Sequence, residues 1–352
     1  MKTGSTGSST TCRSGREELL VLAPNWLGDA VMATPFLLVL REWFPGALIT
    51  VVSRDYAAEL FRRNAAIDFV VAYRGGVRAC IAAARKHMST KGYNACFVLP
   101  PSFAAALVSR ACRARRRIGY GGQWRSILLT DALPERGMRA EHLSKAYLRL
   151  LERFAGRLVP AVPLPVVVPG EGWKEAADAA GGHAAYFVLA PGATYGSSKV
   201  WPYARFAELA RRLVERTNWT AVCVGREEER EPASALLGTV GNAGRNLAGR
   251  LSVSELVSVL RGARITIGND SGPVHIAAAL GVPTVAVFGP TSVDWTAPRG
   301  TAVRIVKGDI ECAPCFKRRC PYGAAECLMR VDVARVHTAA VSLIEEVRRE
   351  TA

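Results

Sequence analysis

The chain has no long apolar segment, and this absence argues against membrane-spanning and secreted proteins. No run of about 18 uninterrupted apolar residues occurs in the 352-residue sequence, so we expect no transmembrane helix. The N-terminal segment MKTGSTGSSTTCRSGREE is rich in Ser, Thr and Gly and lacks the apolar stretch of a signal peptide. We therefore interpret residues 1–16 as a disordered tail and expect a cytoplasmic protein.

Several functional signatures are also missing. The sequence contains no zinc-finger, helix-turn-helix or RNP pattern, which disfavours a nucleic-acid partner, and no Walker pattern, which disfavours a P-loop ATPase. The net charge of +16 nevertheless indicates an acidic partner. The net charge alone does not distinguish among three such partners: nucleic acid, an anionic membrane surface and a phosphorylated substrate.

The residues that are present are typical of a two-domain α/β protein, with 49% hydrophobic and 22% charged residues. The first half begins with a strand over residues 18–23, a helix over 30–43 and a strand over 48–53. The same alternation returns over residues 186–225 and 264–288. Between the two halves lies a proline-rich segment that cannot form a helix or a central strand, with prolines at 160, 163, 165 and 169.

This pattern predicts two Rossmann-like, doubly wound domains, over residues 17–165 and 166–335, followed by a C-terminal helix over 336–352. In such folds ligands bind at the carboxyl ends of the strands. We therefore expect the active site in a central cleft between the two domains.

Two strand-to-helix junctions in the second half are candidate anion sites. The loop PGATYGSSKVW offers hydroxyl groups and one cation, and backbone N–H groups at a helix start favour anions; its candidate ligands are Thr194, Ser197, Ser198 and Lys199. The second junction contains Asp270, Ser271 and Gly272, with His275 one helical turn further on. An ordinary surface loop and a half-buried histidine are the alternatives, but two such junctions favour a diphosphate ligand.

Acidic residues mark two further positions. Glu227 or Glu228 follows a strand and can accept hydrogen bonds from ribose hydroxyls, although a solvated acidic patch is nearly as consistent. Asp29, in NWLGDAVMATP, is either a helix N-cap or a general base at the end of the first strand. Gly28 beside it would let the backbone approach a ligand closely.

Basic and sulfur-containing residues are clustered. An acid-free run of arginines suits an acceptor with carboxylates or phosphates, an anionic leaflet, or simply a solvated face, and includes Arg113, Arg115, Arg116, Arg117 and Arg125. Four of the nine cysteines lie close together, at Cys312, Cys315, Cys320 and Cys327. In a cytosolic chain this spacing favours a structural zinc site; an iron–sulfur cluster and four reduced thiols are the alternatives.

Together these segments resemble glycosyltransferase family nine, the ADP-heptose:lipopolysaccharide heptosyltransferases. The resemblance runs from about residue 19 to residue 336 and is most specific in NWLGDAVMATP and GNDSGPVHIAAALGVPTVAVFGPT. The run ECAPCFKRRCPYGAAECLMRV is most similar to the heptosyltransferase II subgroup.

The resemblance implies a GT-B fold and inverting, metal-independent transfer of L-glycero-D-manno-heptose from ADP-heptose to the heptosylated inner core (Kdo-lipid A) of lipopolysaccharide. It implies that Asp29 is the catalytic base and that the acceptor lies near Asn25, Trp26 and Gly28. The donor would be held by Thr194, Lys199, one of the two glutamates, and the junction that contains Asp270, Ser271, Gly272 and His275. No catalytic cofactor is implied, and the lipid acceptor implies work at the inner leaflet.

Several alternatives stay open at this point. Within the family they are heptosyltransferase I, heptosyltransferase III or a transferase of another sugar. Outside it, a nucleotide-sugar epimerase would also have two Rossmann-like domains but would leave the arginine run without a purpose. A basic protein that binds nucleic acid or membranes would explain the charge but not two anion junctions.

Overall fold

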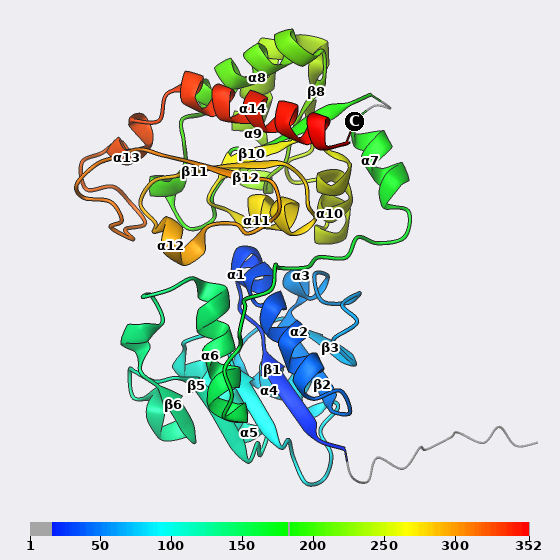
Figure 1. The fold of residues 1–352 in the computed structure, drawn as a ribbon, viewed down its shortest axis with the longest axis vertical. Helices are drawn as coiled ribbons and strands as arrows, with labels where there is room; N and C mark the ends of the chain where they lie inside the picture. Colours follow the sequence, from blue (N-terminus) through cyan, green and yellow to red (C-terminus); the bar gives the residue numbers. More distant parts are fainter. Residues whose placement is uncertain (1–15, 182–183, 352) are drawn as a thin grey trace, which may run out of the picture.

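The computed structural model describes residues 16–181 and 184–351, which form two α/β halves stacked end to end (Figure 1). Each half is built on a six-stranded sheet in which all neighbouring strands are parallel. This architecture confirms the α/β, doubly wound fold class predicted from the sequence. No helix in the described residues is long and apolar enough to cross a membrane.

The N-terminal sheet has the strand order β3-β2-β1-β4-β5-β6. Its strands are β1 (Glu18–Leu22), β2 (Leu48–Arg54), β3 (Phe69–Tyr73), β4 (Ala95–Val98), β5 (Arg116–Tyr120) and β6 (Asp131–Leu133). The helices of this half are α1 (Leu27–Met32), α2 (Thr34–Trp43), α3 (Asp55–Ala58), α4 (Val77–Arg85), α5 (Phe103–Ala111) and α6 (Leu143–Ala155), with short 3₁₀ turns η1 (Arg125–Leu128) and η2 (Glu135–Gly137).

Alternate residues of β1 enter two different cores, as the pleat of a strand requires. Leu19 and Val21 lie in the same apolar cluster as residues of α2 and α6, whereas Leu20 and Leu22 cluster with residues of α4 and α5. Both faces of the sheet are therefore covered, which explains why its central strands are uniformly apolar.

The C-terminal sheet has the order β12-β11-β10-β7-β8-β9. Its strands are β7 (Tyr186–Ala190), β8 (Thr220–Cys223), β9 (Gly244–Asn246), β10 (Thr266–Asn269), β11 (Thr284–Phe288) and β12 (Val303–Lys307). The helices are α7 (Trp173–Gly181), α8 (Tyr203–Thr217), α9 (Arg230–Leu237), α10 (Val253–Gly262), α11 (Gly272–Ala279), α12 (Val293–Thr296), α13 (Glu326–Met329) and α14 (Val333–Thr351). Short 3₁₀ turns are η3 (Ser197–Lys199), η4 (Glu227–Glu229) and η5 (Gly238–Ala243).

Two details differ from the sequence-based expectation. The helix expected over residues 30–43 is divided into α1 and α2 at Ala33, because Pro35 occupies the first turn of α2 and cannot donate a backbone hydrogen bond to the preceding turn. The C-terminal helix starts at Val333 and packs against α8 and the β11–β12 side of its own sheet (Figure 1).

The proline-rich segment over residues 156–172 connects the halves and contacts both of them. The backbone N–H of Val166 donates to Oγ1 of Thr34 at 2.9 Å, in the N-terminal half. Arg299, in the C-terminal half, donates to the carbonyls of Val162 and Pro163 at 3.1 and 3.3 Å. The connection is thus fixed at several points along its length.

Candidate active site

The two halves meet where α1 approaches the start of α11. A β-carbon at position 28 would lie 2.9 Å from Cδ2 of His275, and one at position 272 would lie 2.9 Å from Cβ of Leu27. Both distances are shorter than side chains tolerate, so Gly28 and Gly272 allow the helices to pack this closely. The contact brings the end of β1 and the end of β10 to one place.

Aromatic and polar contacts reinforce this junction. The guanidinium of Arg139, in the N-terminal half, lies 5.1 Å from the ring centres of both Trp295 and Phe316, in the C-terminal half. Nε2 of His142 lies 2.9 Å from the carbonyl oxygen of Ala297. Such cation–π contacts typically contribute about 0.5–1 kcal/mol each at exposed sites.

The carboxylate of Asp270 is the centre of the polar network on the C-terminal side. Its Oδ2 lies 2.5 Å from Nζ of Lys199 and accepts a hydrogen bond from Thr291 at 2.7 Å, and its Oδ1 lies 3.4 Å from Nε2 of His275. Burial alone would raise the pKa of Asp270, but the hydrogen bonds and positive charges of His275 and Lys199 outweigh it and hold the pKa at about 2. Asp270 is therefore ionised and holds the Lys199 ammonium in place.

Asp29 faces this network from the N-terminal side. It lies in the first turn of α1, half-buried, and its side chain makes no cap hydrogen bond, so the N-cap interpretation is wrong; the capping position is Trp26. Burial raises the pKa of Asp29 to about 6, and the nearby charges of His275 and Lys199 limit the rise. A carboxyl group with this pKa can exchange a proton near neutral pH.

The loop that carries Lys199 is held by the cysteine-rich segment. Tyr195 donates its hydroxyl hydrogen to the carbonyl of Phe316, and the hydroxyl of Ser198 donates to the carbonyl of Lys317, both at 2.5 Å. Gly196 lies so close to the carbonyl of Arg318 that a β-carbon there would overlap it. The Ser198 hydroxyl is thus buried and already engaged in its hydrogen bond to Lys317, whereas Thr194 and Ser197 are exposed.

The acidic turn after β8 separates three neighbouring glutamates. Glu228 is exposed and pairs with Arg226, while Glu227 pairs with Arg230 and places its carboxylate directly against Gly249. Glu229 points inward: its carboxylate accepts the N–H of Arg226 at 2.8 Å and lies against Gly192. Burial raises the pKa of Glu229. Of the two glutamates considered from sequence, Glu227 is the one packed against a second loop of the same sheet edge.

Three polar groups of this site were not found by sequence reasoning. Thr291 and Thr296 contact the Asp270 carboxylate from the loop and helix after β11, and Glu229 contacts the start of the Lys199 loop. Thr291 ends the motif GNDSGPVHIAAALGVPTVAVFGPT and Glu229 adjoins Glu228, so both stood in segments already singled out, whereas Thr296 lies outside them. Each reaches the site through tertiary folding. Ser271 was predicted, and its buried hydroxyl has no hydrogen-bond partner among the described residues.

The arginine run is not brought to this site. Arg113 and Arg115 are exposed just before β5, and Arg116 and Arg117 begin that strand, whereas Asp29 follows the opposite, carboxyl end of β1. Arg116 pairs with Asp131 at 2.7 Å. Arg117 donates to the carbonyls of Leu128 and Ala114. Arg125 is buried and donates to two backbone carbonyls. The structure therefore does not support the expectation that these five side chains bind the acceptor.

By contrast, Asn25 and Trp26, which were also predicted to contact the acceptor, lie exposed beside Gly28 at the start of α1.

The zinc site expected at the four cysteines is not supported either. Cys312, Cys315, Cys320 and Cys327 all line one small cavity, but within residues 16–181 and 184–351 no group of three or more His, Cys, Asp or Glu side chains is arranged to hold a metal ion. The segment is instead fixed by backbone contacts: the N–H of Phe316 donates to the carbonyl of Pro290 at 2.8 Å, in addition to its contacts with the Lys199 loop. Its four thiols are free.

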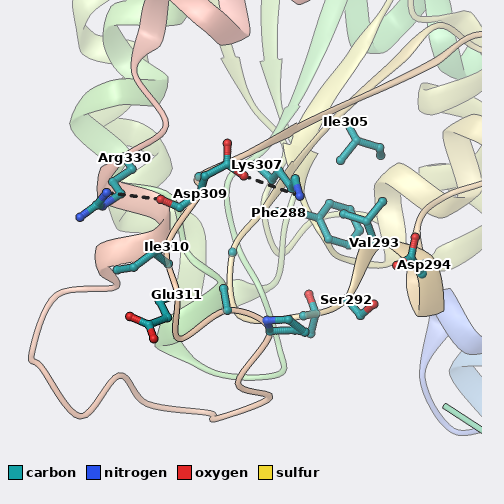
Figure 2. Close-up of a pocket in the computed structure, with 15 residues that line it drawn as sticks. Phe288, Ser292, Val293, Asp294, Ile305, Lys307, Asp309, Ile310, Glu311 and Arg330 are labelled. Carbon is teal, nitrogen blue, oxygen red and sulfur yellow. Dashed lines mark hydrogen bonds and ion pairs between the residues drawn. The ribbon is translucent and has the colours of Figure 1, made fainter. Parts of the chain in front are cut away.

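A cavity of about 880 Å³ opens beside the site, at the carboxyl ends of β11 and β12 (Figure 2). Thr291 lines this cavity and also donates to Asp270, so the two are connected. Lys307 and Asp309 form an ion pair at 3.6 Å in its wall, and Arg330 donates to the carbonyl of Asp309 (Figure 2). None of the residues predicted from sequence to bind a ligand lines the cavity.

Comparison with known proteins places the chain in a family. The model of glycosyltransferase family 9 (heptosyltransferase) matches residues 81–326. The chain belongs to glycosyltransferase family 9. The family and the GT-B fold expected from NWLGDAVMATP and GNDSGPVHIAAALGVPTVAVFGPT are thereby confirmed.

Individual relatives of this family 9 glycosyltransferase agree. Lipopolysaccharide heptosyltransferase 2 of Salmonella typhimurium is 28% identical over 82% of the chain and 88% of its own length. The solved structure of the Escherichia coli ADP-heptose lipopolysaccharide heptosyltransferase II is 26% identical, has a TM-score of 0.80, and covers 94% of the chain and 99% of its own. Lipopolysaccharide heptosyltransferase 1 of Pseudomonas aeruginosa is 39% identical, but over only 51% of the chain and 49% of its own length.

The close packing of α1 on α11 predicts a steric cost for enlarging Gly28. Gly28→Ala should lower the free energy of unfolding by about 1–3 kcal/mol, since the new methyl group forces His275 to move in a packed junction. Urea denaturation measures the change. Gly46→Ala is the matched control, because nothing lies within 4 Å of a β-carbon there. Equal stability of the two variants would contradict the packing described.

Proposed function

We propose that this glycosyltransferase transfers L-glycero-D-manno-heptose from ADP-heptose to the heptosylated inner core of lipopolysaccharide, the heptosyltransferase II reaction. Its main support is that Asp29, whose pKa burial raises to about 6, faces Lys199, Asp270 and His275 across the junction of the two halves. A base thereby lies opposite the lysine and the helix start that we assign to the diphosphate. The names of relatives similar over more than four-fifths of the chain support the choice of sugar and acceptor.

The donor diphosphate binds in this proposal between the Lys199 loop and the start of α11. The Lys199 ammonium, the exposed Thr194 hydroxyl and the N–H groups of Ser271 and Gly272 compensate its negative charge. Asp270 does not contact the phosphates, because its carboxylate is buried and occupied; it positions Lys199 and His275 instead. Glu227, at the edge of the same sheet, accepts hydrogen bonds from the ribose hydroxyls.

These groups stabilise ADP as the leaving group by fixed charges and dipoles. We propose that they do so without a catalytic divalent ion. Asp29, in its ionised form, accepts the proton of an acceptor hydroxyl, which attacks the anomeric carbon from the face opposite ADP. The C–O bond to ADP breaks as the new C–O bond forms, so the configuration inverts in a single displacement.

The acceptor sugar enters from the N-terminal half in this scheme. The exposed Asn25 and Trp26 and the backbone at Gly28 lie in the same turn as Asp29 and are the groups that would position it. An aromatic ring and backbone polar groups suit a sugar, which has one apolar face and many hydroxyls. The lipid A-core acceptor implies work at the inner leaflet.

The base role of Asp29 predicts a specific kinetic defect. Asp29→Asn should lower kcat about 10³-fold while ADP binding changes less than about threefold, because proton acceptance is lost and the Lys199–Asp270 pair is kept. In the unsubstituted enzyme kcat/KM should fall tenfold per pH unit below about 6, since protonation of Asp29 removes the base. Heptosyl-transfer rates give kcat and kcat/KM, and calorimetric titration with ADP gives its affinity.

Glu42→Gln, on the exposed side of α2, is the matched control and should leave both quantities unchanged. Stability serves as a second check. Burial lifts the folded-state pKa of Asp29 above its unfolded value, so the ionised carboxylate costs stability above pH 6. Asp29→Asn should therefore fold at least as well as the parent protein at pH 7.5. Retained transfer with lost ADP binding would overturn the assignment.

The heptose addition step is tested by the choice of acceptor. Core lipids with no heptose and with one heptose are offered side by side with ADP-heptose, and the products are weighed by mass spectrometry. We expect a mass gain of one heptose on the mono-heptosylated acceptor alone. A gain on the heptose-free acceptor would instead identify heptosyltransferase I, the activity in the name of the Pseudomonas relative that matches half of the chain.

A further inference from the structure

One contiguous part of the N-terminal half carries positive charge without any acid. The sequence contains no Asp or Glu between Asp68 and Asp131, and eleven Lys or Arg residues in the same interval. This interval folds into β3, α4, β4, α5, β5 and η1. Three of its cations pair with acids outside the interval, namely Arg74 with Asp55, Arg116 with Asp131 and Arg125 with Glu135; the other eight include the cations of α4 and α5. The active site described above uses none of these cations.

Large apolar side chains are exposed on the same elements. On α5, Phe103 and Leu107 are 45% and 38% exposed, and in the neighbouring turn Trp124 and Ile127 are 83% and 74% exposed. Helix α5 packs against η1, which joins the two pairs into one surface that we call the α5–η1 face. Four exposed side chains of this size gathered on two adjacent elements indicate a binding surface.

The turn that presents Trp124 is firmly held from beneath. Arg125 is buried, and its guanidinium donates to the carbonyls of Tyr120 and Gly121 at 2.7 and 2.9 Å. Arg125 also forms an ion pair with Glu135 at 3.1 Å, so the charge of this carboxylate is compensated. The exposure of the indole is thus a consequence of how the turn is anchored.

Cations surround the apolar groups. Arg110 is exposed one helical turn beyond Leu107 on α5, and Arg113 follows the end of the helix. Arg117 donates to the carbonyl of Leu128 in η1, and desolvation together with the neighbouring charge of Arg110 lowers its pKa. Arg85 reaches the end of α5 from α4, with a hydrogen bond of 2.7 Å to the carbonyl of Ala111.

We propose that the α5–η1 face docks on an anionic lipid bilayer. Trp124, Ile127, Phe103 and Leu107 enter the boundary between headgroups and acyl chains, and the surrounding arginines contact lipid phosphates. A nucleic acid would complement the charge but not these protruding aliphatic and aromatic side chains. An anionic bilayer complements both the charge and the apolar side chains.

The position of the face fits an enzyme that acts on a membrane-bound substrate. Strands β1, β4 and β5 are adjacent and parallel, so the loops that follow them lie at one edge of the sheet. Asp29 follows β1, Phe103 follows β4 and Trp124 follows β5. Neighbouring strands are about 4.8 Å apart, so the ends of β4 and β5, which lead to the α5–η1 face, lie about 5 and 10 Å along the sheet edge from the end of β1, which leads to Asp29.

Vesicle co-sedimentation tests the proposal on the full chain and needs no sugar substrate. Vesicles of phosphatidylcholine with phosphatidylglycerol should bind the protein at least tenfold more tightly than vesicles of phosphatidylcholine alone. The double variant Trp124→Ser/Ile127→Ser should weaken binding to the anionic vesicles at least tenfold. Leu158→Ser, an equally exposed apolar residue (77%) in the connecting segment, is the matched control and should bind like the parent protein.

A second readout separates this proposal from the proposed function. The double variant should transfer sugar to a deacylated, water-soluble acceptor at the parental rate, but should be at least tenfold slower on the same acceptor embedded in vesicles. Equal vesicle binding by the parent and the double variant would overturn the docking surface whatever the reaction is. Salt-sensitive RNA binding that competes with vesicles and is unchanged in the double variant would also overturn it.

Discussion

The ion pair between Asp270 and Lys199 is the interaction on which the site depends. It joins the end of β10 to the loop after β7, and Thr291 adds the loop after β11 to the same carboxylate. A buried charge pair of this kind is costly unless every group in it is satisfied, since desolvation offsets most of the attraction. If Lys199 moved away, the buried Asp270 carboxylate would lose its compensating charge. The ion pair therefore holds the loop after β7 and the end of β10 in one conformation.

The same network gives the junction of the halves its chemical character. His275 contacts Asp270 on one side and packs over Gly28 on the other, so it links the Lys199–Asp270 pair to the turn that carries Asp29. The ion pair on one half and a carboxyl group with a raised pKa on the other are then held face to face by the packing of two helix ends. Neither half alone contains this combination.

The cysteine-rich segment belongs to this arrangement through its backbone. It receives hydrogen bonds from Tyr195 and Ser198 and so braces the Lys199 loop from outside. Phe316, in the same segment, also contacts Arg139 of the other half. Segments that are more than 100 residues apart in sequence are thus combined around the Lys199 loop.

Much of the fold could be predicted from the sequence, because buried parallel strands are nearly continuous apolar runs and turns are marked by Gly and Pro. Four strands were missed, namely β3, β6, β9 and β12, and all four are edge strands of their sheets. β6, for example, has three residues, one of them charged, and is too short for a periodic signal. The break between α1 and α2 was also missed, although Pro35 marks it.

Sequence reasoning identified candidate site residues that stand within one motif, and missed residues that reach the site only through tertiary folding. Asp29, Lys199, Asp270 and His275 lie at or just beyond strand-to-helix junctions, and the structure brings them together; their roles stay predictions. The arginine run misled because adjacent residues of a strand point to opposite faces: Arg116 and Arg117 have different partners, and Arg125 is buried. Spacing alone also overstated the metal site: the four thiols line one small cavity, but among the described residues they are not arranged as ligands of one ion.

A crystal structure with ADP-heptose bound would show whether the donor diphosphate binds beside the Lys199–Asp270 pair, opposite Asp29. A phosphate oxygen should then lie within hydrogen-bonding distance of Nζ of Lys199, with the anomeric carbon directed toward Asp29. A nucleotide sugar seated instead in the cavity lined by Lys307 and Arg330, with its anomeric carbon turned away from Asp29, would contradict this placement.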